Sequence, residues 1–232
     1  MTARGAVREG VRLLAGNLVL LGAIVFTVSI PVSVVGNVVG SDVFGPDAGM
    51  RAFQVSTVMD ALLAPIATGA LIHAVAVLRR GGRPTYGDAM RVGLGNAGRL
   101  FKANVITGAL MLGGLLAGIV PGVLVAVRWA LVDPVVILEG AGWRAAVRRS
   151  TDLTRGRRWA VARAGIVCLA CMGLASLGSG ALQAVPPFGV FPVRVALDGT
   201  VDVVDGLLDV VMVLFYCDFR ARENATAAPA AA

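Results

Sequence analysis

Long apolar runs alternate with short polar connectors along the chain, and this pattern predicts helices that cross a membrane. A crossing helix needs roughly 20 predominantly apolar residues. Runs of about that length or longer cover residues 14–36, 57–78, 103–138, 164–185 and 199–217. The pattern therefore predicts an all-α, polytopic integral membrane protein.

The third run, residues 103–138, is too long for one crossing and about right for two. Pro121 and Gly122 lie near its middle, and this dipeptide is a strong turn signal. We therefore divide the run into 103–120 and 122–138. This division gives six transmembrane helices.

The composition agrees with a membrane protein. Hydrophobic residues make up 57% of the chain and charged residues 15%, whereas soluble globular domains have about 45–50% and about 25%. The mean hydropathy is +0.81, which excludes an ordinary water-soluble domain. We assign residues 1–223 to one six-helix membrane domain and the Ala-rich residues 224–232 to a disordered tail.

The distribution of basic residues predicts the orientation of the helices. With the N-terminus inside the cell, the outer loops hold only Arg51 and Arg194, and Arg128 lies within a helix. The other 18 of the 21 Lys and Arg residues then face the cytoplasm. Because Lys and Arg are concentrated on the cytoplasmic side of membrane proteins, we expect both termini to be cytoplasmic. The expected location is the cell (inner) membrane.

Three basic segments with helical periodicity precede pairs of predicted crossings. Between residues 83 and 102, Met90, Leu94, Ala97 and Phe101 share one helical face and charged residues share the other. Such amphipathic helices lie at membrane surfaces. The N-terminus and the connector after the fourth crossing show the same pattern, so we expect three basic interfacial helices. Anionic lipid headgroups are the predicted partners of the arginines in the last segment: Arg144, Arg148, Arg149, Arg155, Arg157 and Arg158.

Charged residues also fall within or beside the predicted crossings, where each needs a partner or water. Asp198, Asp202, Asp205 and Asp209 are spaced by four, three and four residues, which places them on one helical face. At 1.5 Å per residue, Arg128 lies about 16 Å from the cytoplasmic end of its helix, between Asp209 at about 13 Å and Asp205 at about 19 Å. We therefore predict an intramembrane polar cluster that contains Arg128, Asp133, Asp205 and Asp209.

Two interpretations of this cluster are open. In the first, Arg128 neutralises Asp205 and Asp209 and joins two helices as a structural ion pair. In the second, the same residues line a polar pathway for a solute or a proton. The first is favoured, because a pathway needs polar side chains on more than two helices and the sequence does not clearly show them.

Signatures of the common catalytic and metal sites are missing from the sequence. His73 is the single histidine, and the chain has no HExxH, P-loop or GxSxG motif. The net charge of +7 reflects the membrane orientation and does not indicate nucleic-acid binding. We expect no catalytic residue, metal ion or cofactor, and therefore no enzymatic activity.

Three segments of the sequence resemble a known family. They read PGVLVAVRWALVDPVVILEG (121–140), WRAAVRRSTDLTRGRRW (143–159) and VLFYCDFRARE (213–223). Together they are similar to the membrane domain associated with glycerophosphoryl diester phosphodiesterases and to its uncharacterised prokaryotic relatives. The resemblance implies a six-helix membrane module, with the phosphodiesterase activity carried by a separate soluble domain. We expect that catalytic domain to be absent, because only NATAAPAAA follows Glu223.

Two functions are consistent with these features. The first is a non-enzymatic membrane scaffold that engages the lipid bilayer, anionic headgroups or an unidentified protein partner through its arginine-rich helices. The second is a small transporter or channel whose path passes Arg128 and the aspartates of residues 199–217. The sequence favours the first.

Overall fold

The computed structural model describes residues 2–39, 47–116, 118–186 and 190–227, and this part of the chain is helical without any β-strand. The all-α fold class predicted from the sequence is therefore confirmed. The helices of the described ranges are α1 (Ala3–Gly16), α2 (Leu18–Val39), α3 (Ala48–Arg79), α4 (Tyr86–Leu116), α5 (Ile119–Trp129), α6 (Val132–Glu139), α7 (Trp143–Thr154), α8 (Arg158–Gln183) and α9 (Phe191–Ala227).

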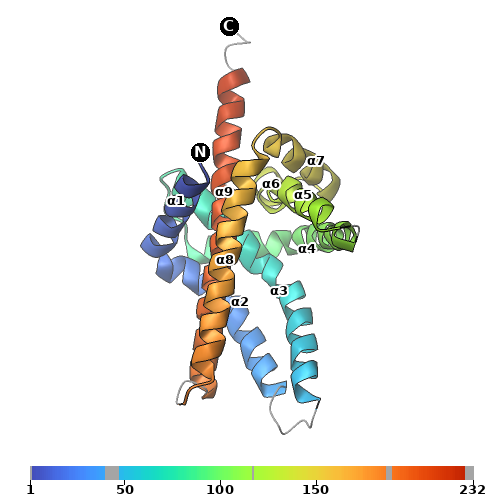
Figure 1. Cartoon of the computed structure of the whole chain (residues 1–232). Helices are drawn as coiled ribbons and strands as arrows, with labels where there is room; N and C mark the ends of the chain where they lie inside the picture. The colour runs from blue at the N-terminus through green and yellow to red at the C-terminus, as the bar shows by residue number, and fades with distance from the viewer. Residues whose placement is uncertain (1, 40–46, 117, 187–189, 228–232) are drawn as a thin grey trace.

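Helix α9 lies at the centre of the bundle and contacts α1, α2, α3, α6, α7 and α8. Figure 1 shows α8 running alongside α9, with α2 and α3 extending toward one end of the molecule and α5, α6 and α7 gathered toward the other. Residues 210–217 of α9 are apolar on every side, and such a helix is stable when it is surrounded. Its side chains enter two hydrophobic cores, through Val211 and Phe215 in one and Val210 and Val213 in the other.

Four helical segments of the described chain are long and apolar enough to cross a membrane: Leu18–Val39, Gly49–Arg79, Val120–Glu139 and Arg158–Gln183. The chain is therefore a membrane protein. These segments overlap the first, second, fourth and fifth predicted crossings. Of the other two predicted crossings, 199–217 lies in α9 and residues 103–116 of 103–120 lie in α4; neither helix is among the four segments. The count of six therefore stays a prediction.

The turn predicted at Pro121 and Gly122 lies a few residues earlier in the structure. α4 ends at Leu116 and α5 begins at Ile119, after Gly118 with a φ of 138°. Pro121 is inside the first turn of α5, where its missing N–H has no helical partner to lose. Gly114 of α4 lets the two helices approach closely at this point, because a Cβ added to it would lie 3.2 Å from the Gly122 Cα.

The predicted crossing 122–138 is not one continuous helix. α5 ends at Trp129 and α6 begins at Val132. Pro134 explains the break, because its ring has no N–H to donate to the carbonyl four residues earlier and crowds that carbonyl. The buried hydroxyl of Ser150 on α7 satisfies two backbone groups beside the break: it accepts from the Leu131 N–H at 3.2 Å and donates to the Arg128 carbonyl at 2.7 Å.

The interfacial helix predicted between residues 83 and 102 is the first half of a longer helix, α4, which continues to Leu116. The face that it buries carries Ala89, Gly93 and Leu100, whereas Leu94 of the predicted apolar face is 59% exposed. Gly93 is the reason, since an added Cβ would overlap the Ile66 carbonyl oxygen of α3. The two helices thus cross through small residues, which an analysis based on large apolar side chains does not identify.

Both terminal helices pack onto the rest of the bundle. Glu9 of α1 forms an ion pair with Arg79 at the end of α3. A Cβ added to Gly10 would lie 2.9 Å from the Val211 side chain, so this glycine brings α1 against α9. α9 continues through Ala227, and residues 224–227 of the predicted disordered tail are therefore helical. Residues 228–232 of that tail lie outside the described part of the chain.

Candidate functional site

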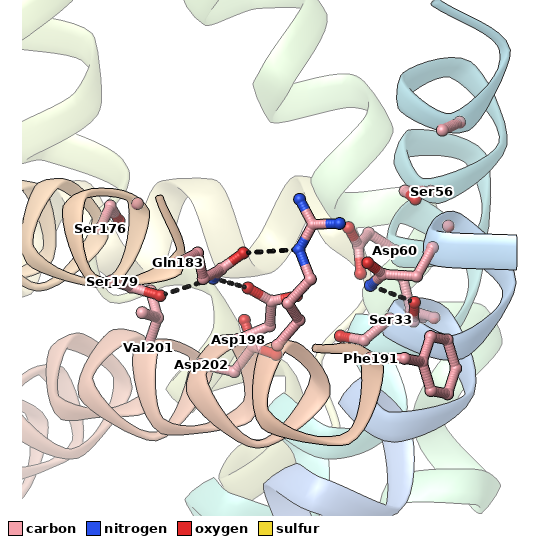
Figure 2. A pocket seen from close by; sticks show the side chains of 16 residues that line it. Ser33, Ser56, Asp60, Ser176, Ser179, Gln183, Phe191, Asp198, Val201 and Asp202 are labelled. Atoms are coloured by element: carbon pink, nitrogen blue, oxygen red, sulfur yellow. Dashed lines mark hydrogen bonds between the residues drawn. The ribbon is translucent and has the colours of Figure 1, made fainter. Parts of the chain in front are cut away.

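A polar cavity of about 730 Å³ lies where α2, α3, α8 and α9 meet. Figure 2 shows polar side chains from opposite walls pointing toward a common space, among them Asp60 and Ser33 from one side and Gln183, Asp198 and Asp202 from the other. The polar side chains that line it come from all four helices: Ser33, Asn37, Ser56, Asp60, Ser176, Ser179, Gln183, Arg194, Asp198 and Asp202.

Gln183, near the end of α8, organises the hydrogen bonds of this cavity. Its amide nitrogen donates to Ser179 Oγ and to Asp198 Oδ1, both at 2.9 Å, and its amide oxygen accepts from Arg194 Nε at 3.4 Å (Figure 2). These bonds connect α8 to the first turns of α9. Arg194 therefore contacts the amide, and it forms no ion pair with a carboxylate of the described chain.

A second cavity of about 280 Å³ adjoins the first, because Asp60 and Asp202 line both. It adds Asp205, Asp209 and Thr68 to the lining. We call Asp60, Asp198, Asp202, Asp205 and Asp209 the acidic column. From Asp198 to Asp209 the column extends along roughly 16 Å of helix.

The carboxyl groups of the acidic column have few partners. Thr68 Oγ1 donates to Asp209 Oδ2 at 3.0 Å, but Asp205 Oδ1 is buried without a hydrogen bond. The Ser29 side chain is 7% exposed, and its hydroxyl has no hydrogen bond of good geometry although Asp202 lies beside it. Among the described residues, no Lys or Arg lies within ion-pair distance of any column carboxyl. Polar groups left unsatisfied inside a membrane protein call for water, a proton or a ligand.

The acidic column is a row of carboxyl groups and does not converge on one point. Asp202 interacts electrostatically with Asp198, Asp60 and Asp205, and Asp209 interacts with Asp205. Within the described ranges, no three His, Cys, Asp or Glu side chains are grouped so as to hold a metal ion. Carboxyl groups arranged in a row offer several successive positions for a proton or a small cation.

Arg128, which the sequence placed beside the aspartates, lies elsewhere. It lines a third cavity with Thr151, Asp152, Arg155, Gly156, Arg158 and Trp159, and it forms no ion pair with Asp205 or Asp209. The predicted depth assumed a straight helix through residues 122–138, whereas Arg128 lies next to the break between α5 and α6. Asp133, beyond the break, does interact electrostatically with Asp209, and its Oδ1 is buried without a hydrogen bond. The structure thus brings the three predicted aspartates together without the arginine.

The arginines predicted to contact lipid have different surroundings. Arg157 stacks on Phe219 at 4.9 Å and Arg144 on Trp143 at 5.0 Å, measured from the guanidinium carbon to the ring centroid. Arg155 and Arg158 line the third cavity with Arg128, and Arg148 is exposed on α7. Contact with lipid stays a prediction for these residues.

Arg149, the remaining arginine, belongs to a network of paired charges. It donates to Glu223 Oε1 at 2.7 Å and Oε2 at 2.5 Å, and to Glu139 Oε1 at 3.4 Å. Glu139 also accepts from the Tyr216 hydroxyl at 2.8 Å and from Arg220 at 3.3 Å. We call these five residues the α7–α9 junction. Their hydrogen bonds connect α6, α7 and α9.

The charges of the junction stabilise each other. The hydrogen bond from Arg149 lowers the pKa of Glu223 below its ordinary value of 4.5. The same hydrogen bond raises the pKa of Arg149. Sequence analysis did not identify this network, although part of a signal was present: Glu139 ends an apolar run just before the arginine cluster, and Glu223 lies a few residues beyond the last apolar run.

Comparison with known proteins gives one family. A family model described as a domain of unknown function, DUF7847, matches residues 85–222. No curated protein and no solved structure matches the chain. The matched residues cover more than half of the chain and include the third cavity, the α7–α9 junction except Glu223, and the α9 part of the acidic column. The chain therefore belongs to the DUF7847 family.

Proposed function

We propose that this protein is a transporter or channel of the cell membrane in which the acidic column forms part of a path for protons or small monovalent cations. One observation carries the proposal. Carboxyl groups without a paired cation line two adjacent cavities, and polar side chains from α2, α3, α8 and α9 surround them. A pathway requires polar groups on more than two helices, and the cavities supply them.

The proposed topology has six crossings and cytoplasmic termini, with α4 and α9 as the crossings beyond the four apolar segments. α9 can cross the membrane although it carries aspartates, because these side chains face cavities inside the bundle instead of lipid. The arginine distribution then places the α7–α9 junction on the cytoplasmic side. Gln183 and Asp198 lie toward the outer side in this topology.

The structural alternative, an ion pair that joins two helices, requires a cation beside the aspartates. Arg128 does not lie there, and Arg194 at the mouth of the cavity contacts Gln183. An unpaired carboxylate in a low-dielectric region is costly unless it takes up a proton, water or a cation. Successive column residues on α9 are three or four positions apart, which corresponds to steps of about 5–6 Å. Such steps suit transfer from one carboxyl to the next through water.

Reconstituted protein tests this function. Purified protein is inserted into liposomes that contain a pH-sensitive dye, and proton entry is measured under an imposed K⁺ diffusion potential. Na⁺ and K⁺ entry are measured in parallel with ion-sensitive dyes. We expect flux above that of empty liposomes, and we expect Asp202→Asn to reduce it roughly tenfold or more.

A matched control separates the column from general charge effects. Asp88→Asn also removes one carboxylate, but Asp88 is exposed at the start of α4 and pairs with Arg91. It should leave the flux unchanged. The proposed function is refuted if protons, Na⁺ and K⁺ all enter liposomes that contain the wild-type protein no faster than they enter empty liposomes.

A second function, the membrane scaffold, is favoured by the exposed Arg144 and Arg148, which form no ion pair among the described residues. A scaffold would give no ion flux in the same assay, so one measurement distinguishes the two functions. The resemblance to the membrane domain of glycerophosphoryl diester phosphodiesterases stays a prediction, because the matching family model carries no function.

A further inference from the structure

The third cavity, of about 660 Å³, lies where the last turn of α5 meets the connector between α7 and α8. We call it the arginine cavity. Three guanidinium groups reach it from two separate parts of the chain, Arg128 from α5 and Arg155 and Arg158 from the connector and the first turn of α8. Gly156, with a φ of 79°, makes the turn that brings the last two to the same place.

The lining of the arginine cavity carries more positive than negative charge. Asp152 is the one acidic residue of its lining, and none of the three arginines forms an ion pair within the described chain. Arg158 Nε is buried and has no hydrogen-bond acceptor. Native structures rarely leave such a donor unsatisfied, so water or a bound ligand has to supply the acceptor.

The shape of the arginine groups identifies the chemistry of that acceptor. A guanidinium presents a planar fork of donors that matches the oxygens of a phosphate and binds them in pairs. Thr151, which donates its own proton to the Val147 carbonyl at 2.8 Å, lines the cavity beside them. Three arginines facing one acid favour a phosphate group that carries negative charge.

The surroundings of the cavity favour a lipid as the source of the phosphate. Trp159, on the cavity wall, is 80% exposed, and tryptophan is enriched at the membrane–water interface. Ile166 lies seven residues further along α8 on the same face and is 63% exposed, and Leu124 of α5 is 50% exposed. An acyl chain has an apolar surface to follow directly beside the arginines.

We propose that Arg128, Arg155 and Arg158 bind the phosphate of an anionic phospholipid whose acyl chains lie along the exposed faces of α5 and α8. The site is separate from the acidic column, so it does not depend on the proposed transport function. Bound lipid holds the last turn of α5 and the α7–α8 connector together, because both contribute to the cavity.

The full-length protein in a zwitterionic detergent provides the test. Its midpoint of thermal unfolding is measured against increasing dioctanoyl phosphatidylglycerol, dioctanoyl phosphatidylcholine and inorganic phosphate. A ligand that binds the folded state raises the midpoint in a concentration-dependent way. We expect a saturating rise with phosphatidylglycerol and little with the other two. Equal rises with both lipids would overturn the proposal, and an equal rise with inorganic phosphate would overturn lipid as the source.

Variants locate the effect in the cavity. The triple variant Arg128→Gln, Arg155→Gln, Arg158→Gln should need roughly tenfold more phosphatidylglycerol for half the shift. The matched control changes three exposed arginines of α1, Arg4→Gln, Arg8→Gln and Arg12→Gln, and removes the same charge. It should change that concentration by no more than about twofold. If the control variant needs an equally increased phosphatidylglycerol concentration, the binding depends only on general surface charge and the proposal is overturned.

A second variant, with lysine at positions 128, 155 and 158, tests the proposal if the glutamine variant does not fold. Lysine in place of the three cavity arginines preserves the charge but loses the planar fork of donors. We expect weaker binding than in the wild type. Wild-type affinity in this lysine variant would overturn recognition of the phosphate by guanidinium groups.

Discussion

The two halves of α9 carry charges in opposite situations. At its C-terminal end, Tyr216, Arg220 and Glu223 join Glu139 and Arg149 in the α7–α9 junction, where every charged group has a partner. In its N-terminal half, the aspartates from 198 to 209 face cavities, and none of them forms an ion pair in the described chain. The comparison separates charges that hold helices together from charges that are free to meet a ligand.

The change in the free energy of unfolding on removing a charge should therefore have opposite signs in the two halves of α9. In the junction, truncating one partner leaves the others without a hydrogen bond and lowers stability. In the acidic column, replacing an unpaired carboxyl by a neutral group removes a desolvation cost and leaves stability unchanged or higher. The same kind of substitution thus distinguishes a structural charge from one that faces a pathway.

The largest effect is expected for Glu139→Leu in the junction. Glu139 accepts hydrogen bonds from Tyr216, Arg149 and Arg220, and its side chain is 20% exposed. Removing the acceptor should cost about 2 kcal/mol, which corresponds to a fall of roughly 5 °C in the midpoint of thermal unfolding in detergent. Glu139→Gln keeps a neutral acceptor and should lose about half as much. An unchanged unfolding midpoint in Glu139→Leu would show that the α7–α9 junction does not stabilise the fold.

The next effect has the opposite sign and concerns Asp205→Asn in the acidic column. Asp205 Oδ1 is buried without a hydrogen bond, so the neutral amide avoids the cost of a buried unpaired charge. We expect the unfolding midpoint to stay the same or to rise by a few degrees, for a gain of up to about 1 kcal/mol. Proton or cation flux should fall in the same variant. A loss of stability as large as that of Glu139→Leu would mean that the column is structural.

The apolar pattern was enough to predict the helices and the membrane class. The runs 14–36 and 164–185 fall in or beside α2 and α8, because a membrane imposes a length that the sequence displays directly. The spacing of the four α9 aspartates likewise predicted one face. Helical periodicity is a local property, and no knowledge of the neighbouring helices is needed to read it.

The partners across the bundle could not be predicted in the same way. Arg128 was placed by counting along a straight helix, and the break between α5 and α6 invalidated that count. Pro134 was the available signal, and the pattern analysis did not use it to divide the helix. Ser29 and Thr68 reach the acidic column from other helices, and such contacts depend on helix packing that one sequence does not specify.

The smallest effect is a pH dependence confined to the junction. Arg149 lowers the pKa of Glu223 from its ordinary value of 4.5. A carboxyl with a lowered pKa in the folded state stabilises the fold above its ordinary pKa, and this contribution is lost as the pH falls through the lowered value. Because the Glu223 side chain is 46% exposed, the contribution should stay below about 1 kcal/mol. The unfolding midpoint of the wild type should therefore exceed that of Glu223→Gln by one or two degrees from pH 7 down to about pH 5.

Below that range the difference should shrink, because the glutamate of the wild type becomes protonated and resembles the glutamine. Arg149 stays charged throughout, since the same hydrogen bond raises its pKa. Other acidic groups also titrate on acidification, so the comparison is repeated in the Arg149→Gln background. There the Glu223→Gln substitution should make no pH-dependent difference, because the coupling between the two residues is already gone. A pH-dependent difference that persists without Arg149 would show that Glu223 has another partner. The ion pair of Arg149 and Glu223 would then no longer distinguish the C-terminal half of α9 from the acidic column.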